Sequence, residues 1–199
     1  MLPESIKQLA ARLSNLPGIG PRQAIRIAIY ISQKESSFID DLAGSLQEIS
    51  NLKNCSDCFL PHANQSSRCR ICSDPKRTTD LIAIVEKITD LLSIEQSQAY
   101  SGRYLVLGDL KKDGELTPEQ EKRIGQLITQ LTSLPNSQAE EIIIALSPTN
   151  HTQISADKLE QRLRGKAKKI TRLGRGLPTG ADIEFSDDET LKNSLKNRS

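Results

Sequence analysis

Four cysteines are the residues of this sequence whose spacing most clearly predicts a chemistry. Cys55 and Cys58 form one CxxC pair, Cys69 and Cys72 form a second, and the chain has no other cysteine. Two CxxC turns can present four thiolates to one tetrahedral zinc ion, because the two-residue gap lets both sulfurs of a turn face the same metal. Since all four ligands come from the protein, the spacing predicts a closed structural site, with one Zn²⁺ per chain.

Two other uses of the cysteines are open, namely two disulfides or a redox-active CxxC motif. Disulfides need an oxidising compartment, and the N-terminus lacks the basic-then-apolar pattern of a targeting segment. A redox motif is normally single and lies beside a strand–helix unit. The loop between the two pairs is short and polar, so a metal would have to supply its folding energy. His62 lies in this loop and is expected to be an ordinary loop residue, because four cysteines leave it no coordination position.

A glycine pair in the stretch LPGIGPRQA is the second feature with a predictable chemistry. Gly18 and Gly20 flank one isoleucine and permit a tight turn, whose backbone N–H groups could approach a phosphate without side-chain obstruction. Pro21 suits the first turn of a following helix, and the N-terminus of that helix adds partial positive charge. Arg22 and Arg26 lie one helical turn apart and could reach neighbouring phosphates. The pattern predicts phosphate contacts that carry little sequence information; a plain turn between two helices is the alternative.

Amphipathic segments flank the glycine pair and must position it. Apolar residues recur at helical spacing over residues 4–15 and again from Ala24 to Ile29, and a third amphipathic helix is expected from Phe38 to Ile49. Helix, glycine hairpin and helix together resemble the helix-hairpin-helix module of DNA-binding proteins.

Beyond Pro75 the sequence changes to short apolar runs separated by helical segments. A capping box at Thr117 begins one of these helices, and another helix is expected over residues 152–165. The alternation predicts an α/β layer with a mostly parallel sheet. The expected strands are residues 81–86, 103–107, 141–146 and, more weakly, 169–173.

Glu86 ends the first expected strand, at the edge where such sheets place functional residues. This arrangement resembles the Toprim domain, whose catalytic members pair that glutamate with an Asp-x-Asp motif to hold magnesium. Here the third strand is followed by Ser-Pro-Thr-Asn-His without a carboxylate, and Asp109 and Asp113 have the wrong spacing. We therefore expect no catalytic residue, a structural or interface position for Glu86, and an inert His151.

Charge and composition add three expectations. The formal net charge is only +2, but basic residues crowd residues 158–175 and acidic residues follow over 182–189. Such asymmetry indicates either a polyanion-binding surface, complementary faces in self-association, or simply solvated charge. The chain has no tryptophan, three tyrosines and three phenylalanines, which argues against base stacking on aromatic platforms. No apolar run approaches the length of a membrane span, so a cytoplasmic, nucleoid-associated protein is expected.

Taken in order, these motifs resemble the RecR family of recombination mediator proteins over essentially the full length. The stretches that carry the resemblance are LPGIGPRQA, the cysteine pairs CSDC and CRIC with the following SDPKR, the strand before Glu86, SGRYLVL, and GRGLPTG near the C-terminus. The resemblance implies a multidomain α/β (α+β) chain. Its expected parts are a helix-hairpin-helix domain (1–54), a C4 zinc finger (55–78), a Toprim domain (79–173) and a C-terminal oligomerisation segment (174–199).

The same resemblance implies a non-catalytic protein that acts on DNA. RecR proteins assemble into homodimers or ring-like tetramers able to encircle DNA, and they act with RecO and RecF to promote RecA loading. Two stretches depart from the family pattern, residues 108–116 and 147–153, and both lie on the Toprim face used for partner contacts.

Three classes of function are compatible with the residues: a DNA-binding clamp, a magnesium-dependent Toprim nuclease or primase-like enzyme, and a zinc-stabilised scaffold without DNA binding. The missing acidic pair counts against the enzyme. Arg22 and Arg26 beside the glycine hairpin count against the pure scaffold.

Overall fold

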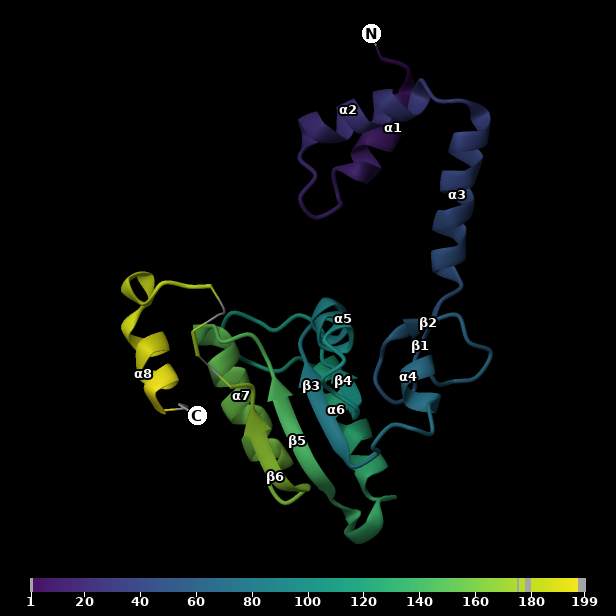
Figure 1. The fold of residues 1–199 in the computed structure, drawn as a ribbon. Coiled ribbons are helices and arrows are strands. Elements are labelled where there is room, and N and C mark those ends of the chain that lie inside the picture. Colours follow the sequence, from purple (N-terminus) through teal and green to yellow (C-terminus); the bar gives the residue numbers. More distant parts are fainter. Residues whose placement is uncertain (1, 175, 178–179, 197–199) are drawn as a thin grey trace. The chain divides into compact units, whose positions relative to one another are not determined.

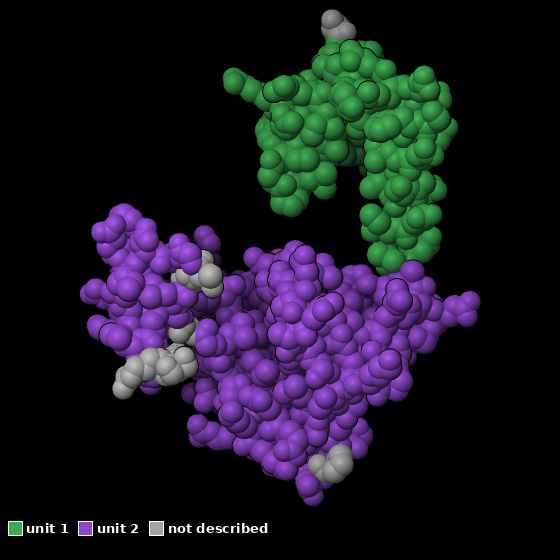
Figure 2. Space-filling view, viewed as in Figure 1, with its two compact units in different colours: residues 1–52 green, residues 53–199 purple. Residues whose placement is uncertain are grey.

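The computed structural model describes residues 2–174, 176–177 and 180–196 (Figure 1). The chain divides into two compact units, Met1–Leu52 and Lys53–Ser199 (Figure 2). The first unit has one hydrophobic cluster and the second has two. Among the described residues, no helix combines the length and the apolar character needed to cross a membrane.

The first unit consists of three helices, α1 (Glu4–Leu13), α2 (Pro21–Ser32) and α3 (Ser36–Ser50). α1 packs against α2 through Ala10, Ala24 and Ala28, which are all buried. Small side chains at these positions let the two helix backbones approach closely, and larger apolar residues of α1 surround the contact. The two helices expected on either side of the glycine hairpin are therefore present.

α3 differs from its neighbours because none of its residues is buried. Its apolar positions are exposed instead, and Leu46 and Ile49 are each 62% exposed. An amphipathic helix gains most of its stability by covering its apolar face. The exposed face of α3 is thus a surface on which another polypeptide could pack.

The second unit begins with the cysteine-bearing segment. Strands β1 (Lys53–Asn54) and β2 (Pro61–His62) form a short antiparallel ribbon, and α4 (Arg70–Ser73) follows. The two cysteine pairs lie around these elements, one in the turn between β1 and β2 and one at the start of α4. His62 lies in β2 and is buried, so it is not the plain loop residue expected from the sequence.

A four-stranded parallel sheet forms the centre of the second unit. Its strands are β3 (Leu81–Val85), β4 (Arg103–Val106), β5 (Ala139–Ala145) and β6 (Ala167–Arg172), in the spatial order β4-β3-β5-β6. The helices α5 (Ile88–Gln96), α6 (Pro118–Leu131) and α7 (Asn150–Leu163) connect them. The predicted parallel α/β fold is confirmed, and element boundaries differ from the expected ones by a few residues. α5 was not singled out from the sequence.

Alternate residues of the central strands face two different cores. Ile82, Ile84 and Leu105 pack with apolar residues of α6 and α7 on one face. Ala83, Val85, Tyr104 and Val106 pack with Leu91 of α5 and with the four cysteines on the other. This period of two is the expected geometry of strands buried on both sides. The cysteine segment therefore packs against one face of the sheet.

The predicted capping box of α6 is present. Thr117 Oγ1 accepts the Gln120 N–H at 3.2 Å, and Gln120 Oε1 accepts the Thr117 N–H at 2.8 Å. At the other end of the chain, a 3₁₀ turn (Ile183–Phe185) precedes α8 (Asp188–Lys196). Arg175, Pro178 and Thr179 of the predicted C-terminal segment lie outside the described residues. The bounds of the four expected parts stay predictions.

Candidate functional site

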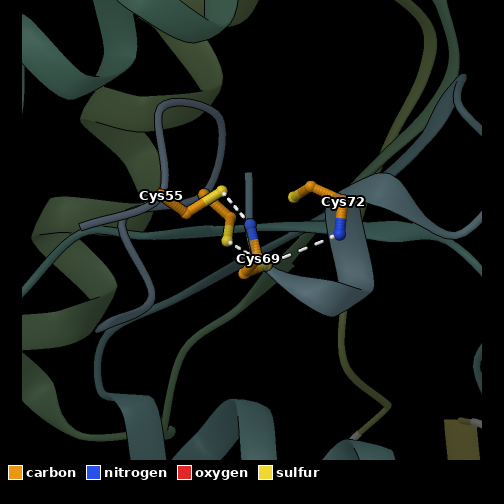
Figure 3. A group of neighbouring side chains, drawn as sticks. Cys55, Cys69 and Cys72 are labelled. Atoms are coloured by element: carbon orange, nitrogen blue, oxygen red, sulfur yellow. Dashed lines mark hydrogen bonds between the residues drawn. The ribbon is translucent and has the colours of Figure 1, made fainter. Parts of the chain in front are cut away.

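The four cysteines meet at one place. Their ligand atoms all lie within 4.8 Å of one another, and the Sγ atoms of Cys58 and Cys69 are 3.5 Å apart. Figure 3 shows Cys55, Cys69 and Cys72 gathered together. Four thiolates around a tetrahedral zinc ion, with Zn–S near 2.3 Å, are separated by about 3.8 Å. All four side chains are buried and none forms a disulfide. The arrangement therefore fits a closed four-sulfur metal site.

Backbone N–H groups point at two of these sulfurs. Cys55 Sγ accepts from the N–H of Asp57 at 3.5 Å and of Cys69 at 3.3 Å, and Cys69 Sγ accepts from the N–H of Cys72 at 3.5 Å. Such donors favour the thiolate over the thiol, and the thiolate is the form that binds metal.

His62 stands apart from this cluster. Its Nδ1 accepts the Asn64 N–H at 3.1 Å, and its buried Nε2 has no hydrogen-bond partner within the described part of the chain. The four cysteines form the only group of three or more possible metal ligands among the residues described. The expectation that His62 is not a ligand therefore agrees with the geometry, although its burial was not expected.

The glycine hairpin lies between α1 and α2 with two backbone donors unused. Ile19 donates its N–H to Leu16 O at 3.2 Å, whereas no acceptor in the described part of the chain bonds the N–H of Gly18 or Gly20. Gly18 has a φ of 80°, a conformation that favours glycine. A Cβ at either glycine would meet no atom within 4 Å, so the space in front of both is open. The hairpin can therefore present these two N–H groups to a ligand outside the chain.

Arg22 and Arg26 lie on the first turns of α2, beside the hairpin. Both are exposed, and neither has a carboxylate or hydrogen-bond partner among the described residues. α2 also has no acidic residue in its first turn, so nothing there opposes the positive end of the helix dipole. The predicted DNA-binding residues thus lie close together along the chain and are available to an anion.

The basic stretch from Lys158 to Arg172 is different, because carboxylates of the same unit neutralise most of it. Arg172 contacts both Asp157 and Glu160, at 2.6 and 2.7 Å. The other ion pairs are Lys158–Glu115, Arg162–Glu121, Lys168–Glu140 and Lys169–Glu141. Arg164 and Lys166 are the members of this stretch without an ion pair in the described part. Most of the positive charge that this stretch carries in the sequence is therefore neutralised in the structure.

Glu86 is buried at the carboxyl end of β3 and supports the neighbouring loop. Its Oε1 accepts the Leu110 N–H at 3.1 Å. Asp113 is occupied within its own loop, where its Oδ1 accepts the Glu115 N–H at 2.9 Å. These carboxylates do not form a cluster of possible metal ligands. His151 lies near the Thr149 hydroxyl, with Nδ1 3.2 Å from Oγ1, and the hydroxyl in turn contacts Thr152.

Two groups of residues around the cysteine site were missed by sequence reasoning. Phe59 and Arg123 stack beside the first cysteine pair, with the Arg123 Cζ atom 4.8 Å from the ring centroid. Arg77 and Glu95 form an ion pair, and the Tyr104 hydroxyl donates a hydrogen bond to Glu95. The hydrogen bond to Glu95 raises the pKa of Arg77. The only local signal in the sequence was Phe59, a bulky residue directly after a CxxC turn, at a position where the backbone is left-handed.

Comparison with known proteins agrees with the order of these parts. Residues 6–50 match the RecR helix-hairpin-helix family, residues 80–174 the Toprim domain family, and residues 176–199 the RecR C-terminal family. Proteins named "Recombination protein RecR" align with nearly the whole chain. The one from Syntrophobacter fumaroxidans is 35% identical over 197 residues, covering 98% of this chain and 96% of that protein.

Two further relatives with the same name come from distant bacteria. The protein from Dehalococcoides mccartyi is 34% identical over 194 residues, covering 97% of this chain and 93% of its own length. The protein from Sphingopyxis alaskensis is 31% identical over 199 residues, covering 100% and 98%. Because both the domain order and full-length identity agree, the chain belongs to the RecR family of recombination proteins.

Proposed function

We propose that the protein is a DNA-binding recombination mediator that grips the phosphate backbone through its helix-hairpin-helix. The observation that carries this proposal is the hairpin itself: among the described residues, the N–H groups of Gly18 and Gly20 and the guanidinium groups of Arg22 and Arg26 have no partner. Backbone N–H groups, a helix N-terminus and arginines are the usual phosphate donors of proteins. Contacts of this kind carry no base code, so binding should not depend on sequence.

The competing surface is the basic stretch of the α/β unit. Most of its cations already have carboxylate partners, and releasing a partner to bind phosphate would offset part of the gain. The hairpin arginines have no such partner to lose in the part of the chain that the structure describes. This difference favours the hairpin as the primary contact.

Replacing Arg22 and Arg26 by alanine should weaken DNA binding, and by similar factors for unrelated duplex sequences. The matched control is the Lys166→Ala, Lys168→Ala double variant, which removes the same formal charge from the competing stretch. Fluorescence anisotropy of labelled duplexes measures both variants. Parental affinity in the arginine variant, with loss of binding in the lysine variant, would move the site to the α/β unit.

We further propose that one Zn²⁺ per chain is held by Cys55, Cys58, Cys69 and Cys72. The support is the buried four-sulfur cluster and the N–H donors that favour thiolate. When bound, the metal supplies folding energy to a segment whose buried apolar side chains are chiefly the four cysteines. The closed ligand set gives it no open position for chemistry.

The Toprim unit is proposed to be non-catalytic. Glu86 accepts the Leu110 N–H, and among the described residues it belongs to no carboxylate group able to hold a magnesium ion. Neither the parent protein nor a Glu86→Gln variant is expected to cut or extend DNA with magnesium or manganese present. Cleavage by the parent that disappears in the Glu86→Gln variant would favour the alternative, a magnesium-dependent Toprim nuclease or primase-like enzyme.

Self-association is proposed as well, as a homodimer or a ring-like tetramer. The exposed apolar face of α3 supports it, because such a face is stabilised when a second chain covers it. Sedimentation should give a mass above the 22.0 kDa of one chain, and a monomer at micromolar concentration would contradict this proposal. Family membership supports RecO and RecF as partners in promoting RecA loading. A binding assay with each purified partner tests that part.

A further inference from the structure

The cysteine site is attached to the open edge of the sheet. β4 is an edge strand that pairs with β3 on one side only. On its other side, Val106 donates its N–H to the carbonyl of Cys58 at 3.0 Å. The four cysteines share one hydrophobic cluster with Val106 and its neighbours. The cysteine segment therefore covers an edge that would otherwise lack hydrogen-bond partners.

Phe59, the residue directly after Cys58, adopts a strained backbone. Its φ is 65°, in the left-handed region that bulky side chains rarely occupy. The Phe59 N–H donates to the Cys55 carbonyl at 3.1 Å, which closes the turn around the first cysteine pair. Glycine could make this turn without strain, so the phenylalanine ring must contribute something else. The ring packs against the core that α6 and the sheet share.

Arg123 of α6 connects this ring to β4. Its guanidinium lies over the Phe59 ring at 4.8 Å, and its Nη1 donates to the Val106 carbonyl at 2.9 Å. Nη2 pairs with Glu119, whereas the buried Nε has no partner among the residues that the structure describes. The stacked ring is thus a third contact of this side chain, beside its hydrogen bond to Val106 and its ion pair with Glu119. The backbone of Val106 is consequently held at its N–H by Cys58 and at its carbonyl by Arg123.

The contacts continue from Val106 into the loop beside Glu86. Gly108 donates its N–H to the Glu86 carbonyl at 2.9 Å, and Leu110 donates to the Glu86 side chain. Gln120, one turn before Arg123 on α6, donates to the carbonyls of Gly108 and Asp109 at 3.3 and 3.0 Å. An unbroken set of contacts thus joins the first cysteine pair to this loop.

We propose that Phe59 and Arg123 are positioning residues that couple metal occupancy of the cysteine site to the loop at residues 107–116. The inference rests on the metal binding proposed above. A bound metal keeps Cys58 in place and so keeps Phe59 in its strained turn. Without metal the turn at Phe59 relaxes and its ring moves away from Arg123. The hydrogen bonds that Cys58 and Arg123 make to the Val106 backbone then weaken. The loop lies at the carboxyl edge of a parallel sheet, where such folds bind their ligands, so metal loss would alter that surface.

Amide hydrogen exchange of the full-length protein, with metal and after chelation, tests the coupling. Metal removal should speed exchange in residues 106–110 by about tenfold or more, in line with the loss of one hydrogen bond and one cation–π contact. The reference is β5, which reports the general loss of stability on metal removal, and its exchange should speed up at least about tenfold less than that of residues 106–110. Equal acceleration in both segments, or none in either, would overturn the coupling.

A Phe59→Gly variant supplies the second test, because glycine suits the turn while removing the ring. It should retain one metal per chain by elemental analysis, yet exchange rapidly in residues 106–110 even when loaded. Chelation should then speed exchange of residues 106–110, relative to β5, by a clearly smaller factor than it does in the parent protein. Lys122→Ala, an exposed change on the same helix, should behave as the parent does.

The two proposals fail in different ways. If the parent protein holds no metal, both the zinc site and the coupling are wrong. If metal binds but the Phe59→Gly variant keeps the metal dependence of the parent, only the coupling is wrong.

Discussion

Replacing Cys58 by serine is expected to release the metal and to unfold the segment that carries the cysteines. Cys58 is fully buried, and its carbonyl is the acceptor for Val106 on the sheet edge. Structural zinc sites bind with about 10–16 kcal/mol in small zinc-finger peptides, and that binding energy is folding energy. A loss of at least about 4 kcal/mol should lower the melting temperature by about 10 °C or more for a unit of this size.

Calorimetry together with elemental analysis measures this prediction. Ser67→Ala in the same loop is the matched control, since that side chain is exposed, and it should retain both the metal and the parental melting temperature. Chelating the parent protein should reproduce the Cys58→Ser result. A serine variant that keeps one metal per chain and melts with the parent would exclude the four-cysteine site.

Replacing Gly102 by alanine is expected to destabilise the sheet by about 3 kcal/mol or more, at the upper end of overpacking effects. An added Cβ would collide with the Leu81 carbonyl and with the Tyr100 ring, whose Cζ would lie at 2.6 Å. A backbone carbonyl inside a sheet cannot move aside. Tyr100 could only move by giving up its hydrogen bonds to Leu81 O at 3.1 Å and Arg103 O at 2.9 Å.

Gly125→Ala is the matched control for this effect. Gly125 lies in the interior of α6, and its added Cβ would meet nothing within 4 Å. Alanine there should stabilise the unit by about 0.5–1 kcal/mol, because glycine is a poor helix residue. Urea unfolding of both variants gives the comparison. Equal stability of the two alanine variants would show that the close contact at Gly102 is relieved without strain.

The sequence was sufficient for the parts of the molecule that rest on local periodicity and spacing. The two CxxC pairs predicted a four-sulfur cluster, and the four thiols do converge. Continuous apolar runs predicted buried parallel strands, and β3 and β5 pair in parallel through those runs. Such patterns are readable because one feature of the chain, a two-residue gap or an apolar run, determines the outcome.

Properties that depend on partners distant in sequence could not be read in the same way. The charge of the Lys158–Arg172 stretch looked strongly positive, but acidic residues as distant as Glu115 and Glu121 neutralise it in space. The contact between Phe59 and Arg123 joins positions that are 64 residues apart in the sequence. His62 was expected in a loop, yet a two-residue ribbon with Lys53 buries it.

The central claim is that the glycine hairpin binds DNA phosphates, and the salt dependence of DNA affinity tests it most directly. Each phosphate contact contributes about 0.9 to the slope of log affinity against log salt on duplex DNA. The Arg22→Ala, Arg26→Ala variant should therefore show a slope smaller than that of the parent by up to about 2. An unchanged slope in this variant would contradict the account, because it would mean that neither arginine touches a phosphate.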